Sequence, residues 1–134
     1  MDESVKVLIV DDSNIVCERL VKMLANLKGV SVIGLTGSAA GASHLIAKHQ
    51  PDVITLDLRL ADGSGMEVLR EVKISRPATS VIVLTNHAGP VFKEMCERHN
   101  ADFFFDKAIE FERVGEVLLT LTGRGAARQS FLEC

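Results

Sequence analysis

DVITLDL, residues 52–58, is a nearly continuous apolar run that carries Asp57 close to its end. Such a run is typical of a strand that is buried on both faces, as in a parallel sheet. Similar runs are VLIV at 7–10, VIVL at 81–84 and FFF at 103–105. Each of them is followed directly by residues that carry a carboxylate, a hydroxyl or an amine. The carboxyl ends of parallel strands meet at one edge of a sheet, so these polar side chains are expected to lie together.

Segments of helical periodicity separate the apolar runs. Serine, glycine and proline mark their ends, as Ser13 does before the first of them and Pro90 at the start of the fourth. The strands are expected at about 5–10, 30–35, 52–58, 80–85 and 101–106, and the helices at about 14–28, 38–50, 65–76, 90–100 and 109–121. Strict alternation predicts an α/β fold, a flavodoxin-like (βα)5 domain with helices on both faces of a five-stranded parallel sheet in the order 2-1-3-4-5.

Two of these helices have apolar residues that are expected to face the sheet. Those of the fourth helix are Val91, Phe92 and Met95, and those of the last helix are Phe111, Val114, Leu118 and Leu121. At 134 residues the chain has the size of one domain. We expect that domain over 1–122, with residues 123–134 as a short polar tail or the start of a linker.

Composition excludes several classes of protein. The chain is 47% hydrophobic and 25% charged, with a formal net charge of −3, so neither a membrane span nor a nucleic-acid surface is predicted. The cysteines, Cys17, Cys96 and Cys134, are far apart in sequence, which fits reduced thiols rather than a disulfide framework or a zinc site. These features predict a cytoplasmic protein.

The polar residues at the predicted sheet edge have a definite chemistry. Asp11, Asp12 and Asp57 would repel one another by about 4 kcal/mol per pair at 4 Å and an effective dielectric near 20. Mg²⁺ is the natural counter-charge because it takes oxygen ligands and bridges carboxylates to phosphate. Lys107 adds a second cation, and Thr85 can donate a hydrogen bond to a phosphoryl oxygen. This set suits phosphoryl transfer, which depends on positioning and charge stabilisation.

A carboxylate can itself accept phosphorus and form an aspartyl phosphate. Asp57 is the best candidate, because it is the single carboxylate that ends a central strand. Asp11 and Asp12 would then bind the metal, with Asp12 as the more direct ligand. Taken singly, each residue has a plainer interpretation: Asp12 could support the Ser13 cap, and Lys107 could be a surface lysine.

Four segments together resemble the receiver domain of two-component response regulators, including the chemotaxis-type single-domain regulators. They are LIVDDS at 8–13, ITLDLRLADGSGMEVL at 54–69, VIVLTNHA at 81–88 and ADFFFDKA at 101–108. The resemblance covers about residues 5 to 122. It implies that Asp57 is the phosphoacceptor and that Asp11, Asp12 and Asp57 bind Mg²⁺ together with the main-chain carbonyl of Arg59.

The same resemblance implies a switch. Thr85 and Lys107 would bind the phosphoryl group, and Phe104 would turn inward, remodelling the face of the fourth helix, fifth strand and fifth helix for a protein partner. The phosphoryl donor would be a histidine kinase or a histidine phosphotransfer protein, and the domain would act as a switch rather than as a turnover enzyme. Ala108 departs from the family pattern, in which proline commonly follows the lysine.

Two other functions remain open from the sequence. A Mg²⁺-dependent phosphohydrolase with an aspartyl-phosphate intermediate would use the same carboxylates, although a chain of 134 residues leaves little room for a cap over the substrate. A pure binding module, either a degenerate receiver or a flavin-binding protein, would need no phosphoacceptor. The complete set of Asp12, Asp57 and Lys107 argues against the first form, and the absence of Trp and Tyr argues against the second.

Overall fold

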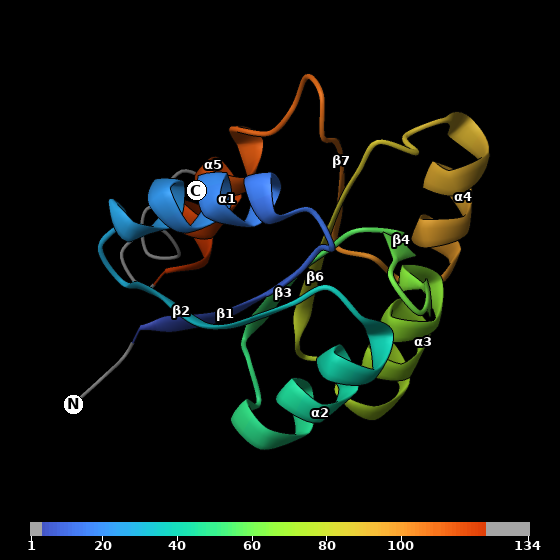
Figure 1. Ribbon diagram of the computed structural model, residues 1–134, viewed down its shortest axis with the longest axis horizontal. Helices are drawn as coiled ribbons and strands as arrows, with labels where there is room; N and C mark the ends of the chain where they lie inside the picture. Colours follow the sequence, from blue (N-terminus) through green and yellow to red (C-terminus); the bar gives the residue numbers. More distant parts are fainter. Residues whose placement is uncertain (1–3, 123–134) are drawn as a thin grey trace, which may run out of the picture.

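The computed structural model describes residues 4–122, which form a sheet covered by helices on both faces (Figure 1). The predicted tail at 123–134, with Cys134, lies outside the described residues. In chain order the elements are β1 (Val5–Val10), α1 (Asn14–Ala25), β2 (Val30–Thr36), α2 (Ala39–His49), β3 (Val53–Leu56), β4 (Arg59–Leu60), β5 (Gly63–Ser64), α3 (Gly65–Ser75), β6 (Ser80–Thr85), α4 (Pro90–Arg98), β7 (Phe103–Asp106) and α5 (Arg113–Leu121).

The main sheet is parallel and has the strand order β2-β1-β3-β6-β7. Counted along the chain without the small β4–β5 hairpin, this is the predicted order 2-1-3-4-5, so the predicted topology is confirmed. The strands after β1 are added first on one side of it, as β2, and then on the other side, as β3, so the switch point of the topology lies between β1 and β3. Ligands in such folds bind in the crevice beyond the carboxyl ends of these two strands. Asp11 and Asp57 follow directly on these two strands.

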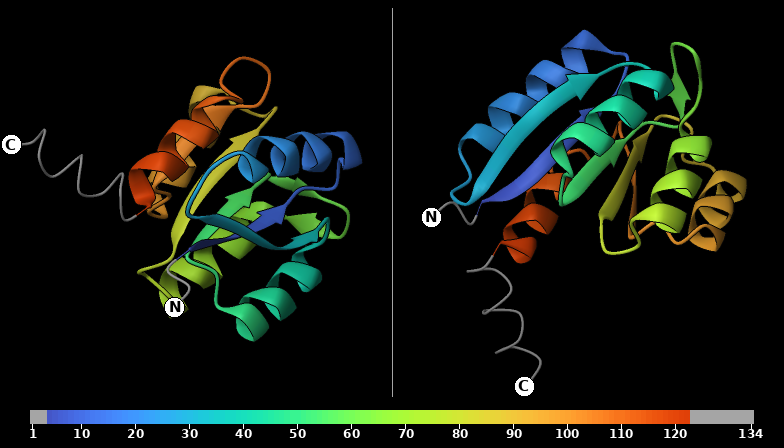
Figure 2. Two further views of the ribbon diagram at one scale, coloured as in Figure 1. Left: turned by 90° about the vertical axis from the view of Figure 1, so that its left-hand side faces the viewer. Right: turned by 90° about the horizontal axis from the view of Figure 1, so that it is seen from below.

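Two apolar layers, one on each face of the sheet, make up the core. On one face, α1 and α5 cover Val7, Ile9, Ile82 and Leu84. On the other face, α2, α3 and α4 pack against alternate residues of the same strands. Figures 1 and 2 show this three-layer arrangement. Both faces of β3 are buried, which explains why its sequence shows a continuous apolar run instead of a polar alternation.

Serine side chains fix the starts of three helices. The Ser13 hydroxyl accepts a hydrogen bond from the Val16 amide at 3.3 Å, Ser38 accepts one from Gly41 at 2.9 Å, and Ser64 accepts one from Met66 at 3.0 Å. Each cap satisfies an amide that the first helical turn leaves without a partner. Ser13 and Ser38 follow β1 and β2, and Ser64 ends β5, so the three caps also fix the ends of the loops that leave the sheet.

The prediction that Val91, Phe92 and Met95 face the sheet is wrong. These side chains are exposed, and Val91 retains 67% of its accessible surface. Cys96 is the residue of α4 that is buried, and its Sγ lies 3.6 Å from the Sδ of Met66. Periodicity identifies an apolar stripe but does not decide whether the sheet or solvent lies beside it, which is why the sequence misled here.

Some predicted element ends also differ from the observed ones. The third strand ends at Leu56, because Asp57 and Leu58 belong to the loop before the β4–β5 hairpin, which the sequence did not predict. The first helix ends at Ala25, before the expected stop near Gly29, and the last begins at Arg113 instead of near residue 109. The inward positions of the last helix segment are confirmed for Phe111, Val114 and Leu118, whereas Leu121 is only partly buried.

Thr55 is an exception in the apolar interior. It lies in β3 between Ile9 and Ile82, and its Oγ1 is buried with no hydrogen-bond partner among residues 4–122. We expect Thr55→Val to raise the free energy of unfolding by about 1 kcal/mol, because valine keeps the shape and removes the cost of an unpaired buried hydroxyl. Urea unfolding followed by circular dichroism measures this change. A loss of stability would show that the hydroxyl is bonded in solution.

Candidate functional site

Polar side chains from three strand ends meet at the carboxyl edge of the sheet. The Nζ atom of Lys107 lies 2.7 Å from Asp11 Oδ2 and 2.9 Å from Asp57 Oδ2. One carboxylate oxygen from each of Asp11, Asp12 and Asp57 lies within 4.8 Å of the others. Asp11, Asp57 and Lys107 are nearly buried, whereas Asp12 is exposed. The structure thus brings together the three predicted carboxylates and the predicted amine.

Main-chain hydrogen bonds hold the loops that carry these side chains. The amide of Asp57 donates to the Val10 carbonyl at 3.0 Å, and the amide of Lys107 donates to the Thr85 carbonyl at 2.9 Å. The sheet ladder therefore continues one step beyond the strands and sets the spacing of the ends. The amide of Ser13 donates to Asp11 Oδ1 at 2.8 Å, so Asp11, not Asp12, supports the start of α1.

The electrostatics of the cluster is unbalanced. Three carboxylates and one ammonium leave two negative charges without a partner. Burial raises the pKa of Asp11, although its hydrogen bonds to Lys107 and to the Ser13 amide act in the opposite direction. Burial lowers the pKa of Lys107, but its hydrogen bonds to Asp11 and Asp57 outweigh that effect and the pKa is raised. The excess of carboxylates over positive charges favours an additional cation at this site.

One atom of the cluster has no bonding partner. Asp57 Oδ1 is buried and accepts no hydrogen bond from any residue in 4–122, while Lys107 takes the other oxygen. An unpaired buried carboxylate oxygen is costly, and a hard cation or a covalent bond would remove that cost. The candidate metal ligands are carboxylate oxygens, and one of the three residues, Asp12, is exposed to solvent. This fits Mg²⁺, an ion that keeps several waters when protein carboxylates bind it.

The remaining predicted residues make no side-chain hydrogen bond or ion pair with this cluster among residues 4–122. Thr85 is fully buried, and its Oγ1 accepts a hydrogen bond from the His87 amide at 3.1 Å. Arg59 lies in β4, two residues after Asp57, with an exposed side chain. Phe104 is partly buried and packs against the layer that α2, α3 and α4 cover. Residues 4–122 contain no cis peptide bond, so the bond from Lys107 to Ala108 is trans.

The sequence did not reveal the contacts that two residues, Asp62 and Gly65, make with other segments. Asp62 belongs to the segment ADGSG, whose residue types are typical of a turn, and it does lie in a turn; its carboxylate also accepts hydrogen bonds from the amides of Ala39 and Ala40, 23 and 22 positions away. Gly65 was predicted only as part of a helix start, but a side chain there would collide with the main chain of Asp57. No local pattern signals either contact, because each joins segments that approach only in the folded sheet.

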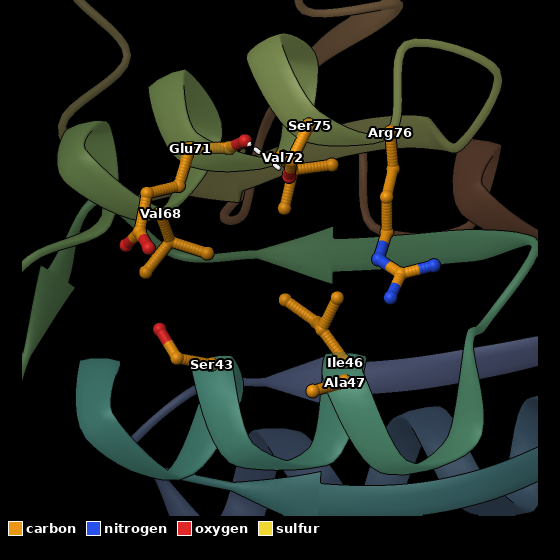
Figure 3. A pocket seen from close by; sticks show the side chains of 8 residues that line it. All are labelled: Ser43, Ile46, Ala47, Val68, Glu71, Val72, Ser75 and Arg76. Carbon is orange, nitrogen blue, oxygen red and sulfur yellow. Dashed lines mark hydrogen bonds between the residues drawn. The ribbon is translucent and has the colours of Figure 1, made fainter.

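The cavity between α2 and α3 is separate from this cluster. It has a volume of about 250 Å³, and Ile46, Val68 and Val72 point into it in Figure 3. Glu71 and Arg76 lie at its rim. None of the predicted site residues lines this cavity, so the chemistry predicted from the sequence belongs to the sheet edge alone.

Comparison with known proteins agrees with this geometry. The Response regulator receiver domain family matches residues 7–119, and the chain belongs to this family. Receiver domains of two-component response regulators act in phosphorylation-dependent signalling and bind Mg²⁺ at an acidic pocket, which here corresponds to the cluster of Asp11, Asp12 and Asp57. The predicted family is therefore confirmed. No helix within residues 4–122 combines the length and apolar character needed to cross a lipid bilayer.

The curated relatives include transcription regulators and protein-glutamate methylesterases, and solved receiver domains are also similar. The chain is 37% identical over 85 residues to the DNA-binding transcriptional activator DevR/DosR of Mycobacterium tuberculosis, covering 63% of this chain and 39% of the relative. It is 30% identical over 109 residues to the transcriptional regulatory protein MalR of Bacillus subtilis, covering 81% and 46%. The signal receiver domain of the putative response regulator NarL from M. tuberculosis superposes with a TM-score of 0.81 at 28% identity, covering 89% and 96%. The chain thus spans less than half the length of these two curated relatives.

Proposed function

We propose that this chain is a phosphorylation-controlled switch that accepts a phosphoryl group on Asp57 from a histidine kinase or a histidine phosphotransfer protein. Mg²⁺ would be held by Asp11, Asp12, Asp57 and the main-chain carbonyl of Arg59. The observation that carries the proposal is the buried, unpartnered Oδ1 of Asp57 within a cluster of three carboxylates, with Lys107 on its other oxygen.

The chain's own residues account for most of the transfer. An Asp57 oxygen attacks phosphorus, and the bond from phosphorus to the donor's leaving group breaks as the new O–P bond forms. Lys107 can bind a phosphoryl oxygen without leaving the cluster, and the Thr85 hydroxyl can donate to another. When bound, Mg²⁺ would neutralise charge on the transferring group. The nearly buried position of Asp57 would limit attack by water.

Charge then provides the switch. The phosphoryl group adds a charge of about −1.5 to −2 at neutral pH, which favours movement of Thr85 and Lys107 toward it. Changing a two-state population from 1:99 to 99:1 requires about 5.5 kcal/mol of differential interaction. A few charge-assisted hydrogen bonds at one buried site can supply energy of this size.

The surface that would respond is made of α4, β7 and α5. The exposed apolar side chains of Val91, Phe92 and Met95 lie on α4, and Ile109, 78% exposed, lies between β7 and α5. Phe104, the predicted switch residue, belongs to β7. Its phenyl ring has no hydroxyl group, so it would act through packing. An apolar surface of this kind suits a protein partner, and we propose that phosphorylation alters its binding.

Incubation with acetyl phosphate and Mg²⁺ tests the proposal. We expect an adduct with the mass of one phosphoryl group that forms in Mg²⁺, is absent in EDTA and is lost on incubation at alkaline pH. Asp57→Asn should abolish it, whereas Asp52→Asn, at the other end of the same strand, should leave it unchanged. An adduct that persists in Asp57→Asn would refute the assignment, and many turnovers on simple phosphate esters would favour a phosphohydrolase instead.

A further inference from the structure

The β4–β5 hairpin begins two residues after Asp57 and is tied at its tip to the start of α2. Asp62 lies at this tip, between the paired strands Arg59–Leu60 and Gly63–Ser64. We infer that Asp62 is a positioning residue for the metal site, since it holds the loop of Asp57 and Arg59 against the loop that follows β2. The inference rests on the proposed function, because it concerns the same metal site.

Three hydrogen bonds make the tie. Asp62 Oδ1 accepts the amide of Ala39 at 2.6 Å, Asp62 Oδ2 accepts the amide of Ala40 at 3.1 Å, and the amide of Ala61 donates to the Gly37 carbonyl at 3.0 Å. In the right panel of Figure 2 the hairpin, in light green, lies beside the start of α2, in teal. Two segments more than 20 residues apart in sequence are thereby fixed to each other.

The bonds are stronger than ordinary surface contacts. A carboxylate at a helix N-terminus is favoured both by the free amides of the first turn and by the helix dipole. The hydrogen bonds from the amides of Ala39 and Ala40 lower the pKa of Asp62, which shows that they favour its charged form. Charge-assisted hydrogen bonds are about twice as strong as neutral ones.

Starting α2 does not depend on Asp62 alone. The Ser38 hydroxyl already caps the helix through the amide of Gly41 at 2.9 Å. Asp62 bonds to two other amides of the same turn and comes from a different segment. The two caps therefore differ in what they connect: Ser38 acts within the helix, whereas Asp62 connects the helix to the phosphoacceptor loop.

The loop after β2 continues the connection to the acidic pair. A side-chain carbon at Gly37 would lie only 2.9 Å from the Cα of Asp12, so this glycine permits close packing of the two loops. The amide of Asp11 also donates to the Thr36 carbonyl at 2.9 Å. Asp62 thus ties the segment with Asp57 and Arg59 to the segment that packs against Asp12. The proposed metal ligands come from both sides of this tie.

Losing the tie should weaken metal binding before it unfolds the domain. Partners that orient metal ligands commonly change metal affinity by about 10- to 100-fold when they are removed. We expect Asp62→Ala to weaken Mg²⁺ binding about tenfold. Asp62→Asn, which keeps one acceptor oxygen but loses the charge, should lie between the alanine variant and the wild type.

Isothermal titration calorimetry with MgCl₂ measures this affinity in the full chain, with Ser38→Ala as the matched control. Ser38→Ala removes a cap from the same helix turn but leaves the hairpin attached, so its Mg²⁺ affinity should match the wild type even where its melting temperature falls. Amide chemical shifts of Gly37, Ala39 and Ala40 should change on Mg²⁺ addition in the wild type and much less in Asp62→Ala.

The outcomes separate this inference from the proposed function. Wild-type Mg²⁺ binding that Asp62→Ala retains in full, or that Ser38→Ala weakens equally, would overturn the positioning role and leave the switch intact. Absence of Mg²⁺ binding in the wild type would overturn both. Asp62→Asn decides the question should the alanine variant not fold, because its conservative change keeps one bond to α2.

Discussion

Replacing Lys107 with methionine is expected to lower the free energy of unfolding by about 3–5 kcal/mol in Mg²⁺-free buffer. Lys107 is nearly buried and lies within 3 Å of oxygens from both Asp11 and Asp57. Methionine fills a similar volume but supplies no charge, so two buried carboxylates lose their shared partner. Breaking a buried pair in this way costs much more than the pair itself contributes, because the remaining charge is unpaired.

Two dependences identify the cause of this loss. Added Mg²⁺ should restore part of the stability, because the cation replaces the missing positive charge. Acid should also reduce the deficit. Burial raises the pKa of Asp11 in the folded protein, and losing the Lys107 hydrogen bond would raise it further, so the folded variant binds a proton more readily than the unfolded one. Its stability relative to the wild type therefore rises as the pH falls toward that pKa.

Chemical unfolding with and without MgCl₂, over a series of pH values, measures both dependences. Lys73→Met is the matched control, because Lys73 is also largely buried and pairs with Asp102 at 2.6 Å, in a contact outside the acidic cluster. Its loss of stability should not respond to Mg²⁺. Equal rescue of both variants would contradict the proposed electrostatics, since Mg²⁺ would then act elsewhere on the protein.

Much of this site follows from the sequence because strand ends are easy to locate. Four apolar runs identify four buried strands, and the one or two residues after each run must lie at one edge of a parallel sheet. That reasoning places Asp11, Asp57, Thr85 and Lys107 at the same edge without any coordinates. The strand order follows from chain alternation and the handedness of crossovers. The local signals and the global topology agree at these positions.

The features that the sequence did not reveal depend on contacts between distant segments. Aspartate is common in turns, so its residue type alone does not distinguish Asp62. Its hydrogen bonds to α2 form only when β2 and β3 lie on either side of β1 in one sheet. The outward side of α4 is likewise set by the sheet and neighbouring helices, not by its own pattern. An apolar helix face that binds a partner has the same sequence pattern as one that packs against the core.

Gly65 gives the second large effect, and we expect Gly65→Ala to lower the free energy of unfolding by about 3 kcal/mol. A side-chain carbon at this position would overlap the carbonyl oxygen of Asp57 and lie 3.0 Å from both the carbonyl carbon of Asp57 and the Cα of Leu58. These are main-chain atoms, so no flexible side chain can move aside. The amide of Gly65 also donates to the Leu58 carbonyl at 2.8 Å, which holds the loop at this close distance.

Relief of that overlap requires the phosphoacceptor loop to move, so Gly65→Ala should slow acetyl phosphate labelling as well as lower stability. Gly89→Ala is the matched control, because Gly89 also lies at the start of a helix, as the N-cap of α4, but a side chain there meets nothing within 4 Å. Gly89→Ala should lower the free energy of unfolding by less than about 1 kcal/mol, as for an ordinary cap substitution. Its rate of labelling by acetyl phosphate should not change. Wild-type stability in Gly65→Ala would mean that the loop of Asp57 shifts freely, and a loop that shifts freely could not hold the carboxylates at the spacing that Mg²⁺ requires.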